Sequence, residues 1–496
     1  MLSINILWKL ALSWRAKSPT IIQLLHKPHS TSIKDSFQVT YAYPSEITNL
    51  LSSLKNTSAC GVDDIPVAAV KSAADLISAP LASLINTSIS AGIFPDALKI
   101  AKVIPIYKNG DKSLISNYRP ISLLNTFSKV YETFFLRKLE VFIKKHDILY
   151  DKQFGFQKNR STQFALVSFL DTITEALDQN AYALSLFIDL SKAFDTLNHS
   201  LLLKKLYKIG IRGIALDFIK SYLTDRVQFV ELNGDPSDLH KISCGVPQGS
   251  ILGPMLFLLY INDLHLCTKL LNLFLFADDT TIVFTSTDLN FLIASVNREL
   301  QSLSNWFAQN KLSVNVSKTN YMIFKTYPVA SLNMPLLLDG KSITRVSSTK
   351  FLGVIIDERL AWKPQALAVE KKLAMANFII RKIRYKININ TALKLYDALI
   401  LSHMNYCNLI CGNTCKSYTQ NISRLQKRTL KMCACNNSNK SDNVYAVTER
   451  LPFSNIHTMQ IARLAFSYLH NPLSLPKCIA SLFQTSSDIH AHQTRS

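Results

Sequence analysis

The segment 271–284, LNLFLFADDTTIVF, constrains the fold of this chain more than any other stretch. Its first half is apolar and its second half is rich in β-branched residues, with Ala277-Asp278-Asp279 between them. Two short runs of strand-forming residues around a tight polar break predict a β-hairpin. Two interpretations of the acids stay open here: aspartates favoured by a turn, or two carboxylates that bind a hard divalent cation. A metal site would need a third ligand elsewhere.

Asp189 is a candidate for that third ligand. It follows the apolar run 183–188, which is interrupted only by Ser185 and is typical of a buried strand. If this strand lies beside the hairpin, Asp189 and Asp278 meet at one edge of the sheet, with Asp279 adjacent. Three acids can hold two divalent ions about 3.5–4 Å apart, the arrangement used for in-line attack at phosphorus. The alternative is that Asp189 caps the helix that follows.

The charge of the chain narrows the class of partner. The net charge is +21 over 496 residues, although a composition of 48% hydrophobic and 18% charged residues is ordinary for a globular protein. Such an excess favours a polyanionic partner, with nucleic acid first and an anionic membrane surface second. No stretch reaches the roughly 18 consecutive apolar residues of a membrane span, so we expect no membrane association. Nine cysteines at irregular spacing favour a reducing, intracellular compartment.

Seven sequence blocks resemble those of reverse transcriptases from non-LTR retrotransposons, near the jockey group. In chain order they are YRPISLL at 118–124, QFGF at 153–156, FIDLSKAFD at 187–195, GVPQGSILGP at 245–254, FADD at 276–279, LSVNVSKT at 312–319 and FLGV at 351–354. No single block is specific, but seven in the family's order are. The resemblance implies an RNA-directed DNA polymerase with an α+β, right-hand fold of fingers, palm and thumb. Its antiparallel palm sheet would be backed by helices and followed by a mostly helical, basic C-terminal region.

The resemblance also implies a role for the matched residues around the metal. Asp189 and Asp278 would be the principal Mg²⁺ ligands, Asp279 would shape the site, and the backbone carbonyl of Leu190 would help to hold the nucleotide-bearing ion. Mn²⁺ is an expected substitute. Phe194 stands where the family has an aromatic steric gate beneath the sugar, which predicts deoxynucleoside triphosphates as substrates. The alternative is that Phe194 is an ordinary core residue.

Further matched residues are expected to contact the nucleotide. Lys108 and Arg119 would bind the triphosphate, because arginine recognises phosphate in a bidentate manner and lysine supplies a point charge. Gln248 and Gly249 would lie against the incoming nucleotide and its template base, where glycine permits close approach of the backbone. Lys318 is similar to the lysine thought to protonate departing pyrophosphate.

Two groups of residues are expected to lie outside the chemistry. Asp195 and His199 belong to a matched block, and we interpret them as structural. The C-terminal cysteines have no regular paired spacing and are more typical of small core residues than of a zinc site. These cysteines are Cys407, Cys411, Cys415, Cys433 and Cys435.

Composition divides the chain into four parts. Residues 1–43 are predicted to be a disordered or truncated leader, because the first 34 residues carry basic residues and no acid; a mitochondrial presequence is the less favoured alternative. Residues 44–360 would form the fingers and palm. Residues 361–445 would form a basic, helical thumb and connection that follows the template-primer backbone. Residues 446–496 would form a helical extension and a disordered tail.

The expected partners are an RNA template, a DNA primer and deoxynucleoside triphosphates, in a ribonucleoprotein of the nucleus or cytoplasm. The oligomeric state stays open. Elements of this kind usually carry an endonuclease domain ahead of the polymerase, and no such domain or separate RNase H constellation is found, so we expect a genomic fragment. The competing hypothesis is a catalytically idle, nucleic-acid-binding remnant, against which the three intact acids argue. A metal nuclease would have no use for the PQG loop or the aromatic gate.

Overall fold

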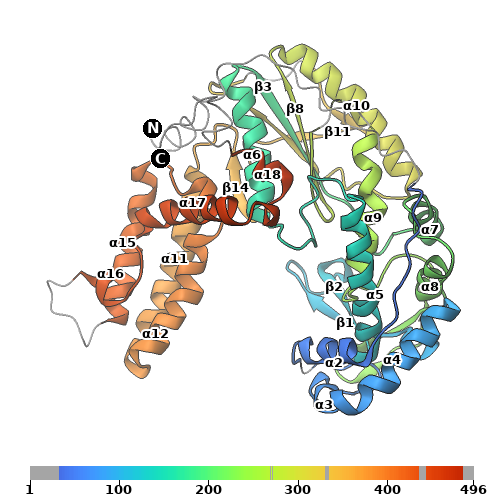
Figure 1. The fold of residues 1–496 in the computed structure, drawn as a ribbon. Coiled ribbons are helices and arrows are strands. Elements are labelled where there is room, and N and C mark those ends of the chain that lie inside the picture. The colour runs from blue at the N-terminus through green and yellow to red at the C-terminus, as the bar shows by residue number, and fades with distance from the viewer. Residues whose placement is uncertain are drawn as a thin grey trace, which may run out of the picture.

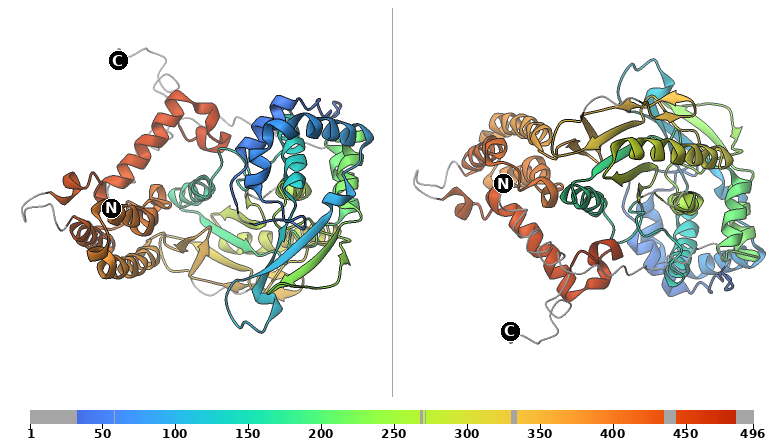
Figure 2. Two further views of the ribbon diagram at one scale, coloured as in Figure 1. Left: turned by 90° about the horizontal axis from the view of Figure 1, so that it is seen from below. Right: turned by 90° about the horizontal axis from the view of Figure 1, so that it is seen from above.

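The computed structural model describes residues 33–57, 59–267, 270, 272–329, 334–434 and 443–483. Most of the predicted leader, the predicted tail beyond 483 and Cys435 lie outside these described residues. Figure 1 shows a central sheet with two mostly helical arms, one on each side, and the two views of Figure 2 show the same separation. The predicted α+β class is therefore confirmed. We name the parts after the predicted right hand: palm in the centre, fingers and thumb as the arms.

The fingers sheet runs in the order β2-β1-β4-β5, with β6 beside β4. Its strands are β1 (Ile100–Tyr107), β2 (Tyr118–Leu123), β4 (Val227–Leu232), β5 (Asp235–Pro236) and β6 (His240–Lys241). Ile242 and Cys244 predict a short strand at 242–244, but this prediction is wrong, because β6 ends at Lys241. Beyond that point the Cys244 thiol donates to the Asp195 carbonyl, and the Gly245 N–H donates to the Leu197 carbonyl at 2.7 Å.

The helices on the fingers side surround one large hydrophobic core. They are α2 (Pro44–Ser53), α3 (Val67–Ser72), α4 (Ala74–Ala91), α5 (Thr126–Lys145), α7 (His199–Lys208) and α8 (Ile214–Leu223). The same core continues under the palm, where α9 (Gly253–Ile261) and α10 (Leu289–Gln309) contribute to it. Apolar residues at helical spacing predict a helix over 289–310, which α10 confirms, and the apolar run after Ser250 predicts a helix over 251–264. However, α9 is shorter than the expected 251–264, since the chain tightens into a 3₁₀ helix from Asn262.

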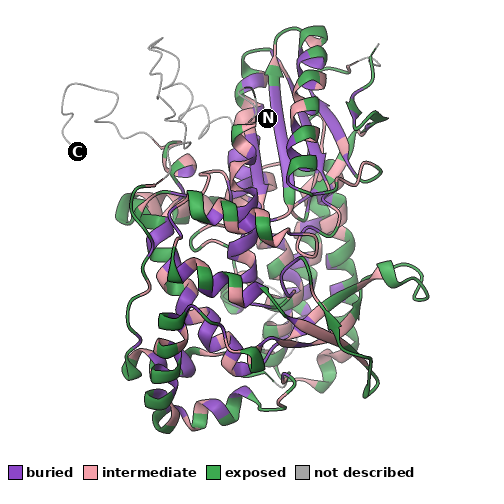
Figure 3. Cartoon of the chain, turned by 90° about the vertical axis from the view of Figure 1, so that its right-hand side faces the viewer, coloured by how far each residue is buried: buried purple, intermediate pink, exposed green. Residues whose placement is uncertain are grey.

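The palm sheet has the strand order β12-β9-β3-β8-β7. The strands are β3 (Tyr182–Ile188), β7 (Asn272–Phe276), β8 (Asp279–Ser286), β9 (Asn320–Phe324) and β12 (Thr344–Arg345). All neighbours pair antiparallel except β12 with β9, which is parallel. Alternate residues of β3 enter two cores: Ala183 and Phe187 face the cluster around α6 (Thr162–Asp178), and Leu184 and Leu186 face the larger core. Burial on both faces explains the nearly continuous apolar run; Figure 3 shows these strands as buried.

The thumb follows the hairpin of β13 (Ser348–Phe351) and β14 (Val354–Asp357). It contains α11 (Lys363–Ile383), α12 (Ile389–Tyr396), α13 (Ser402–Asn405), α14 (Asn408–Cys411), α15 (Lys416–Cys433), α16 (Val444–Val447) and α17 (Phe453–His470). The short α18 (Lys477–Ala480) then returns to the palm. There Ile479 is fully buried in the α6 cluster, and the Lys477 ammonium lies 2.6 Å from the Asp147 carboxylate.

A minor hairpin of β10 (Leu337–Leu338) and β11 (Lys341–Ser342) packs beside α10.

None of the helices in the described part of the chain has the length and apolar character needed to cross a membrane.

Candidate active site

The hairpin predicted around Asp278 and Asp279 is present. Phe276 pairs with Asp279, so the turn between β7 and β8 contains only two residues, Ala277 and Asp278. Ala277 is buried and adopts a φ of 58°, the positive value that a two-residue turn needs in order to match the twist of its strands. Asp278 therefore lies at the tip of the turn, and Asp279 is the first residue of β8.

Strand pairing brings Asp189 to the same end of the sheet. Ile188, the last residue of β3, pairs with Thr280 of β8, so the antiparallel register continued by one residue places Asp189 opposite Asp279. Directly opposed residues lie on the same face of a sheet. The alternative that Asp189 caps the following helix is wrong. Helix α7 is capped by Asn198, whose side chain accepts from the Leu201 N–H.

The block 312–319 fixes the backbone on either side of Asp189. The Asn315 N–H donates to the Asp189 carbonyl at 2.8 Å, and the Asp189 N–H donates to the Thr319 hydroxyl at 3.4 Å. Leu190 forms an isolated bridge with Val314. The LSVNVSKT block thus holds the FIDLSKAFD block in place, although more than 110 residues separate the two in the chain.

The three carboxylates repel one another. Although the Asp279 side chain reaches solvent, the packed walls of the site remove part of its hydration, and the charges of Asp278 and Asp189 add to this effect. Together they raise the pKa of Asp279 to about 6. Loss of hydration also raises the pKa of Asp278, as does the charge of Asp189, while Arg119 opposes the rise.

This donor set is suited to a divalent cation, which would offset both the loss of hydration and the repulsion that raise the pKa of Asp279. Asp189, Asp278 and the carbonyl of Leu190 would supply hard oxygen ligands. In the described part of the chain, no three Asp, Glu, His or Cys side chains converge into a preformed metal cluster. A cation would therefore have to draw the carboxylates together as it binds.

The glycine-rich loop 245–250 links the palm to the fingers. On the palm side, the Gln248 amide donates to the Asp195 carboxylate at 2.7 Å, and the His199 ring lies 2.7 Å from the Gly245 carbonyl. On the fingers side, the Ser122 N–H donates to the Gln248 carbonyl at 2.7 Å. Gly249 has a φ of 128°, and a Cβ there would lie 2.6 Å from the Ser122 carbonyl oxygen. Asp195 and His199 thus bind the loop itself.

Phe194 lies at the edge of the site. Its ring packs 4.6 Å from Phe257 of α9, and a half-exposed ring, Phe156, meets it edge-on at 6.1 Å. Phe194 itself is only partly buried and packs against the main core. The side chain therefore combines a core-facing side with a surface that a ligand can reach.

The three predicted cations differ in their relation to the acids. Arg119, on β2, has an exposed side chain, and its charge acts on the carboxylate of Asp278. Lys108 follows β1, and its N–H donates to the Asn117 carbonyl at 2.8 Å while its side chain is exposed. Lys318 is exposed on the block that clamps Asp189.

Two buried polar residues for which the sequence predicted no role support the site. The Gln153 side-chain oxygen accepts from the Ala277 N–H at 3.1 Å and from the Gly155 N–H at 2.9 Å, which holds the Asp278 turn from below. Glu132 of α5 accepts from the backbone N–H groups of Ile251 and Leu252. The signal for Glu132 is its spacing, because it falls on the apolar stripe of α5 with Phe135, Leu139 and Phe142.

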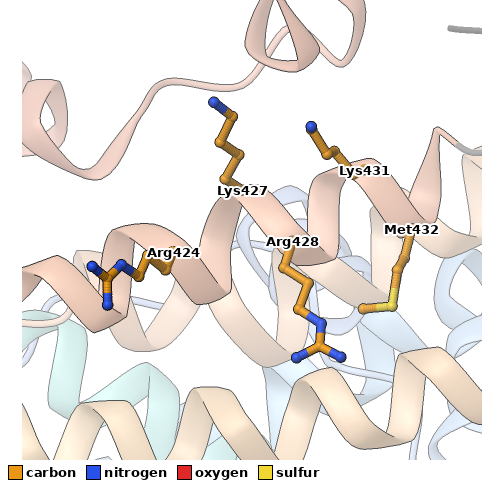
Figure 4. A pocket seen from close by; sticks show the side chains of 5 residues that line it. All are labelled: Arg424, Lys427, Arg428, Lys431 and Met432. Atoms are coloured by element: carbon orange, nitrogen blue, oxygen red, sulfur yellow. The ribbon is translucent and has the colours of Figure 1, made fainter. Parts of the chain in front are cut away.

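The thumb carries a basic surface on α15. Arg424, Lys427, Arg428 and Lys431 are exposed and, with Met432, line a shallow hollow. Figure 4 shows that Lys427 and Lys431 point to one side of the helix, and Arg428 and Met432 to the other. Spacings of three and four residues place the backbone positions of these cations near one another on the helix surface, and their long side chains then spread in two directions. This surface is suited to a polyanion.

Comparisons with known families and curated proteins both find reverse transcriptases. The profile of the family described as reverse transcriptase (RNA-dependent DNA polymerase) matches residues 106–356, just over half of the chain. The probable RNA-directed DNA polymerase from transposon BS of Drosophila melanogaster is 28% identical over 403 residues, 78% of this chain and 44% of that protein. The RNA-directed DNA polymerase from mobile element jockey of the same species is 27% identical over 402 residues, 78% of this chain and 43% of that protein.

Among solved structures, a telomerase from Candida albicans is similar, with a TM-score of 0.44 and 12% identity, over 73% of this chain and 68% of that one. The chain spans less than half the length of the transposon relatives that it matches. The family match includes the fingers strands from Ile106, Asp189, the glycine-rich loop and the Asp278 turn. The chain therefore belongs to the reverse transcriptase family and is homologous to the polymerases of the BS and jockey mobile elements.

Proposed function

We propose that this chain is an RNA-directed DNA polymerase of a retrotransposon, which extends a DNA primer on an RNA template with deoxynucleoside triphosphates. Membership of the family implies dependence on a divalent metal, and we propose Mg²⁺, with Mn²⁺ as a substitute. The observation that carries the proposal is the β3–β8 register, which sets Asp189 opposite Asp279 and beside the Asp278 turn. Residues 44–360 would act as fingers and palm, and 361–445 as thumb and connection.

The proposed reaction depends mainly on positioning and on charge stabilisation, as phosphoryl transfer generally does. Asp189, Asp278 and the Leu190 carbonyl would hold the metal, with Asp279 shaping the site. Bound Mg²⁺ would activate the primer hydroxyl and neutralise charge on the phosphates. The backbone on either side of Asp189 is held by the block 312–319, so the position of this ligand is set before a nucleotide arrives.

The nucleotide would be held between fingers and palm. Arg119 and Lys108 would bind its phosphates, and Lys318 would donate a proton to the departing pyrophosphate. Gln248 and Gly249 would contact the base pair through the loop that Asp195 and Ser122 hold in place. Phe194 would exclude a 2′-hydroxyl. We expect the protein to act in a ribonucleoprotein of the nucleus or cytoplasm.

The test is primer extension on an RNA template with Mg²⁺ and deoxynucleotides, using the wild-type chain and Asp278→Asn. Asn keeps the size of the side chain and removes a charged ligand, so extension should fall about a thousandfold or more, while template-primer affinity changes little. Asp339→Asn, at an exposed turn, is the matched control and should keep full activity.

Template binding by the wild-type chain with no extension at any metal concentration would contradict the proposal. That result would instead support the competing hypothesis of an idle, nucleic-acid-binding remnant.

A further inference from the structure

Glu132 is a buried acid whose hydrogen-bond partners are all donors. Only 1% of the residue is exposed. One carboxylate oxygen, Oε2, accepts from the Ile251 N–H at 2.7 Å, the Leu252 N–H at 2.9 Å and the Tyr222 hydroxyl at 3.3 Å. The other, Oε1, accepts from the Ser128 hydroxyl at 3.0 Å. Four donors around one carboxyl group favour its ionised form.

A buried arginine accompanies this carboxylate. Arg226 is also 1% exposed, and its charge stabilises ionised Glu132, although burial as the larger effect raises the pKa of Glu132. The guanidinium donates through Nη1 to the Tyr222 carbonyl at 3.2 Å, while Nε and Nη2 have no hydrogen-bond partner within the described structure. A buried cation needs a compensating charge, since an isolated one is costly. Glu132 supplies it.

The two backbone donors belong to a functional segment. Ile251 and Leu252 directly follow the glycine-rich loop and lead into α9, where the free N–H groups of a helix start favour a carboxylate. A second contact between this segment and the fingers is the bond from the Ser122 N–H to the Gln248 carbonyl, and the Tyr222 hydroxyl of α8 also interacts with the Ser250 side chain. The loop is therefore attached to the fingers through β2, through α8 and through Glu132 of α5.

We propose that Glu132 is a positioning residue that fixes the loop 245–252 against the fingers and thereby sets the height of Gln248 and Gly249 above the nucleotide. The expected effect of Glu132 on nucleotide binding rests on the proposed function, whereas its expected effect on the loop does not. Glu132 touches no substrate. It acts through the two N–H groups at 251 and 252, which it attaches to α5 of the fingers.

Three substitutions distinguish the effect of the hydrogen bonds to the loop from the effect of packing around Glu132. Glu132→Gln removes the charge beside Arg226 but keeps an acceptor. Glu132→Asp keeps the charge and withdraws the oxygens from the loop by one methylene group, so it tests the loop bonds even if Glu132→Gln does not fold. Ser128→Ala removes a donor from the same carboxylate without touching the loop, and it is the matched control.

The first measurement is hydrogen–deuterium exchange of the full chain. In both Glu132 variants, peptides covering 245–252 should exchange about tenfold faster than in the wild type, while peptides of α11 in the thumb stay unchanged. Ser128→Ala should leave exchange at 245–252 unchanged. Equal exchange in the wild type and Glu132→Asp, or faster exchange throughout the chain, would overturn the proposal. This readout needs no catalytic activity.

The second measurement is the KM for deoxynucleotide and kcat in primer extension. The Glu132 variants should raise KM about tenfold, with kcat changed less than about threefold and template-primer affinity retained. A purely structural role would instead lower kcat through loss of folded protein and leave KM unchanged. If the wild type extends no primer, the proposed function fails, while the exchange experiment still decides the role of Glu132.

Discussion

Phe194 is the residue that we propose selects the sugar of the nucleotide. One side of its ring rests on Phe257 and its edge meets the half-exposed ring of Phe156. Packing against Phe257 restricts how far the ring can turn away from a bound sugar. The position of the side chain is thus set by the core, while its outer surface is available to a substrate.

Shortening this side chain should relax sugar selection. In Phe194→Val, incorporation of ribonucleotides relative to deoxynucleotides should rise at least about tenfold, because the smaller side chain leaves room for a 2′-hydroxyl. The measurement is single-nucleotide extension with matched ribo- and deoxynucleotide pairs. Phe291→Val, at an exposed position of α10, is the control and should keep the wild-type ratio. An unchanged ratio in Phe194→Val would mean that the residue is ordinary core.

For single residues, the sequence predicts a position best when neighbouring residues in the chain determine it. Asp278 lies at a turn tip because strand-forming runs flank it, and Asp189 lies at a strand end because an apolar run stops there. Glu132 and Gln153 could not be assigned in this way. Their partners, Leu252 and Ala277, are 120 and 124 residues away in the chain, so the interaction depends on how the elements pack.

Among the elements, the β7–β8 hairpin depends on a neighbour for its shape. Gln153 accepts from the Ala277 N–H, and a Cβ on Gly155 would lie 2.3 Å from the same nitrogen. The QFGF block therefore packs directly under the turn, and its glycine is required by this close approach. Ala277 holds a positive φ that costs roughly 1 kcal/mol in a residue other than glycine, and the Gln153 bond helps to maintain it.

Removing this support should loosen the metal site. Gln153→Leu keeps the volume of the side chain and leaves the Ala277 N–H without its acceptor, which costs about 1–3 kcal/mol when buried. We expect primer extension to need several-fold more Mg²⁺ for half-maximal rate. Gln157→Leu, which removes only a bond to the Gln153 carbonyl, is the control. An unchanged Mg²⁺ requirement with lower thermal stability would assign Gln153 to the fold alone.

The positions of helices and strands can be predicted from the periodicity of apolar residues when one or both faces of the element are buried. The amphipathic pattern of α10 and the apolar run of β3 predict their positions closely. The expected strand at 242–244 fails, because the pairing with β4 ends after the Ile242 N–H donates to the Arg226 carbonyl, and the Gly245 N–H already donates to the Leu197 carbonyl instead. A local pattern does not show that such a distant acceptor is available.

At the scale of the whole molecule, part of the net positive charge of the chain lies on the basic surface of α15 in the thumb. Lys427→Gln with Lys431→Gln should weaken template-primer binding and reduce the slope of log affinity against log salt concentration by about 0.9 for each phosphate that these lysines neutralise. The measurement is binding at several salt concentrations. Lys208→Gln with Lys220→Gln, both exposed on the fingers side, removes the same charge and is the control. If the two double variants gave equal slopes, the lost affinity would come from the lower net charge and not from the basic surface of α15.

The palm core is completed by the last described helix. Ile479 of α18 is fully buried among residues of the α6 cluster. Ile479→Ala should therefore lower the free energy of unfolding of the palm by about 2–4 kcal/mol, measured by urea denaturation. Leu473→Ala, at a position that is 94% exposed, should change it by less than about 0.5 kcal/mol. A small effect of Ile479→Ala would mean that α18 is only loosely attached.

This return of the chain changes how the thumb should be regarded. In topological terms the thumb is an excursion that leaves the palm after β14 and re-enters it at α18, with Cys407 and Ile410 touching the same palm core on the way. Both ends of the excursion and its middle are therefore held by one hydrophobic core, so the thumb and the palm should unfold together. Deleting the C-terminal attachment would expose the α6 cluster and damage the palm before it freed the thumb.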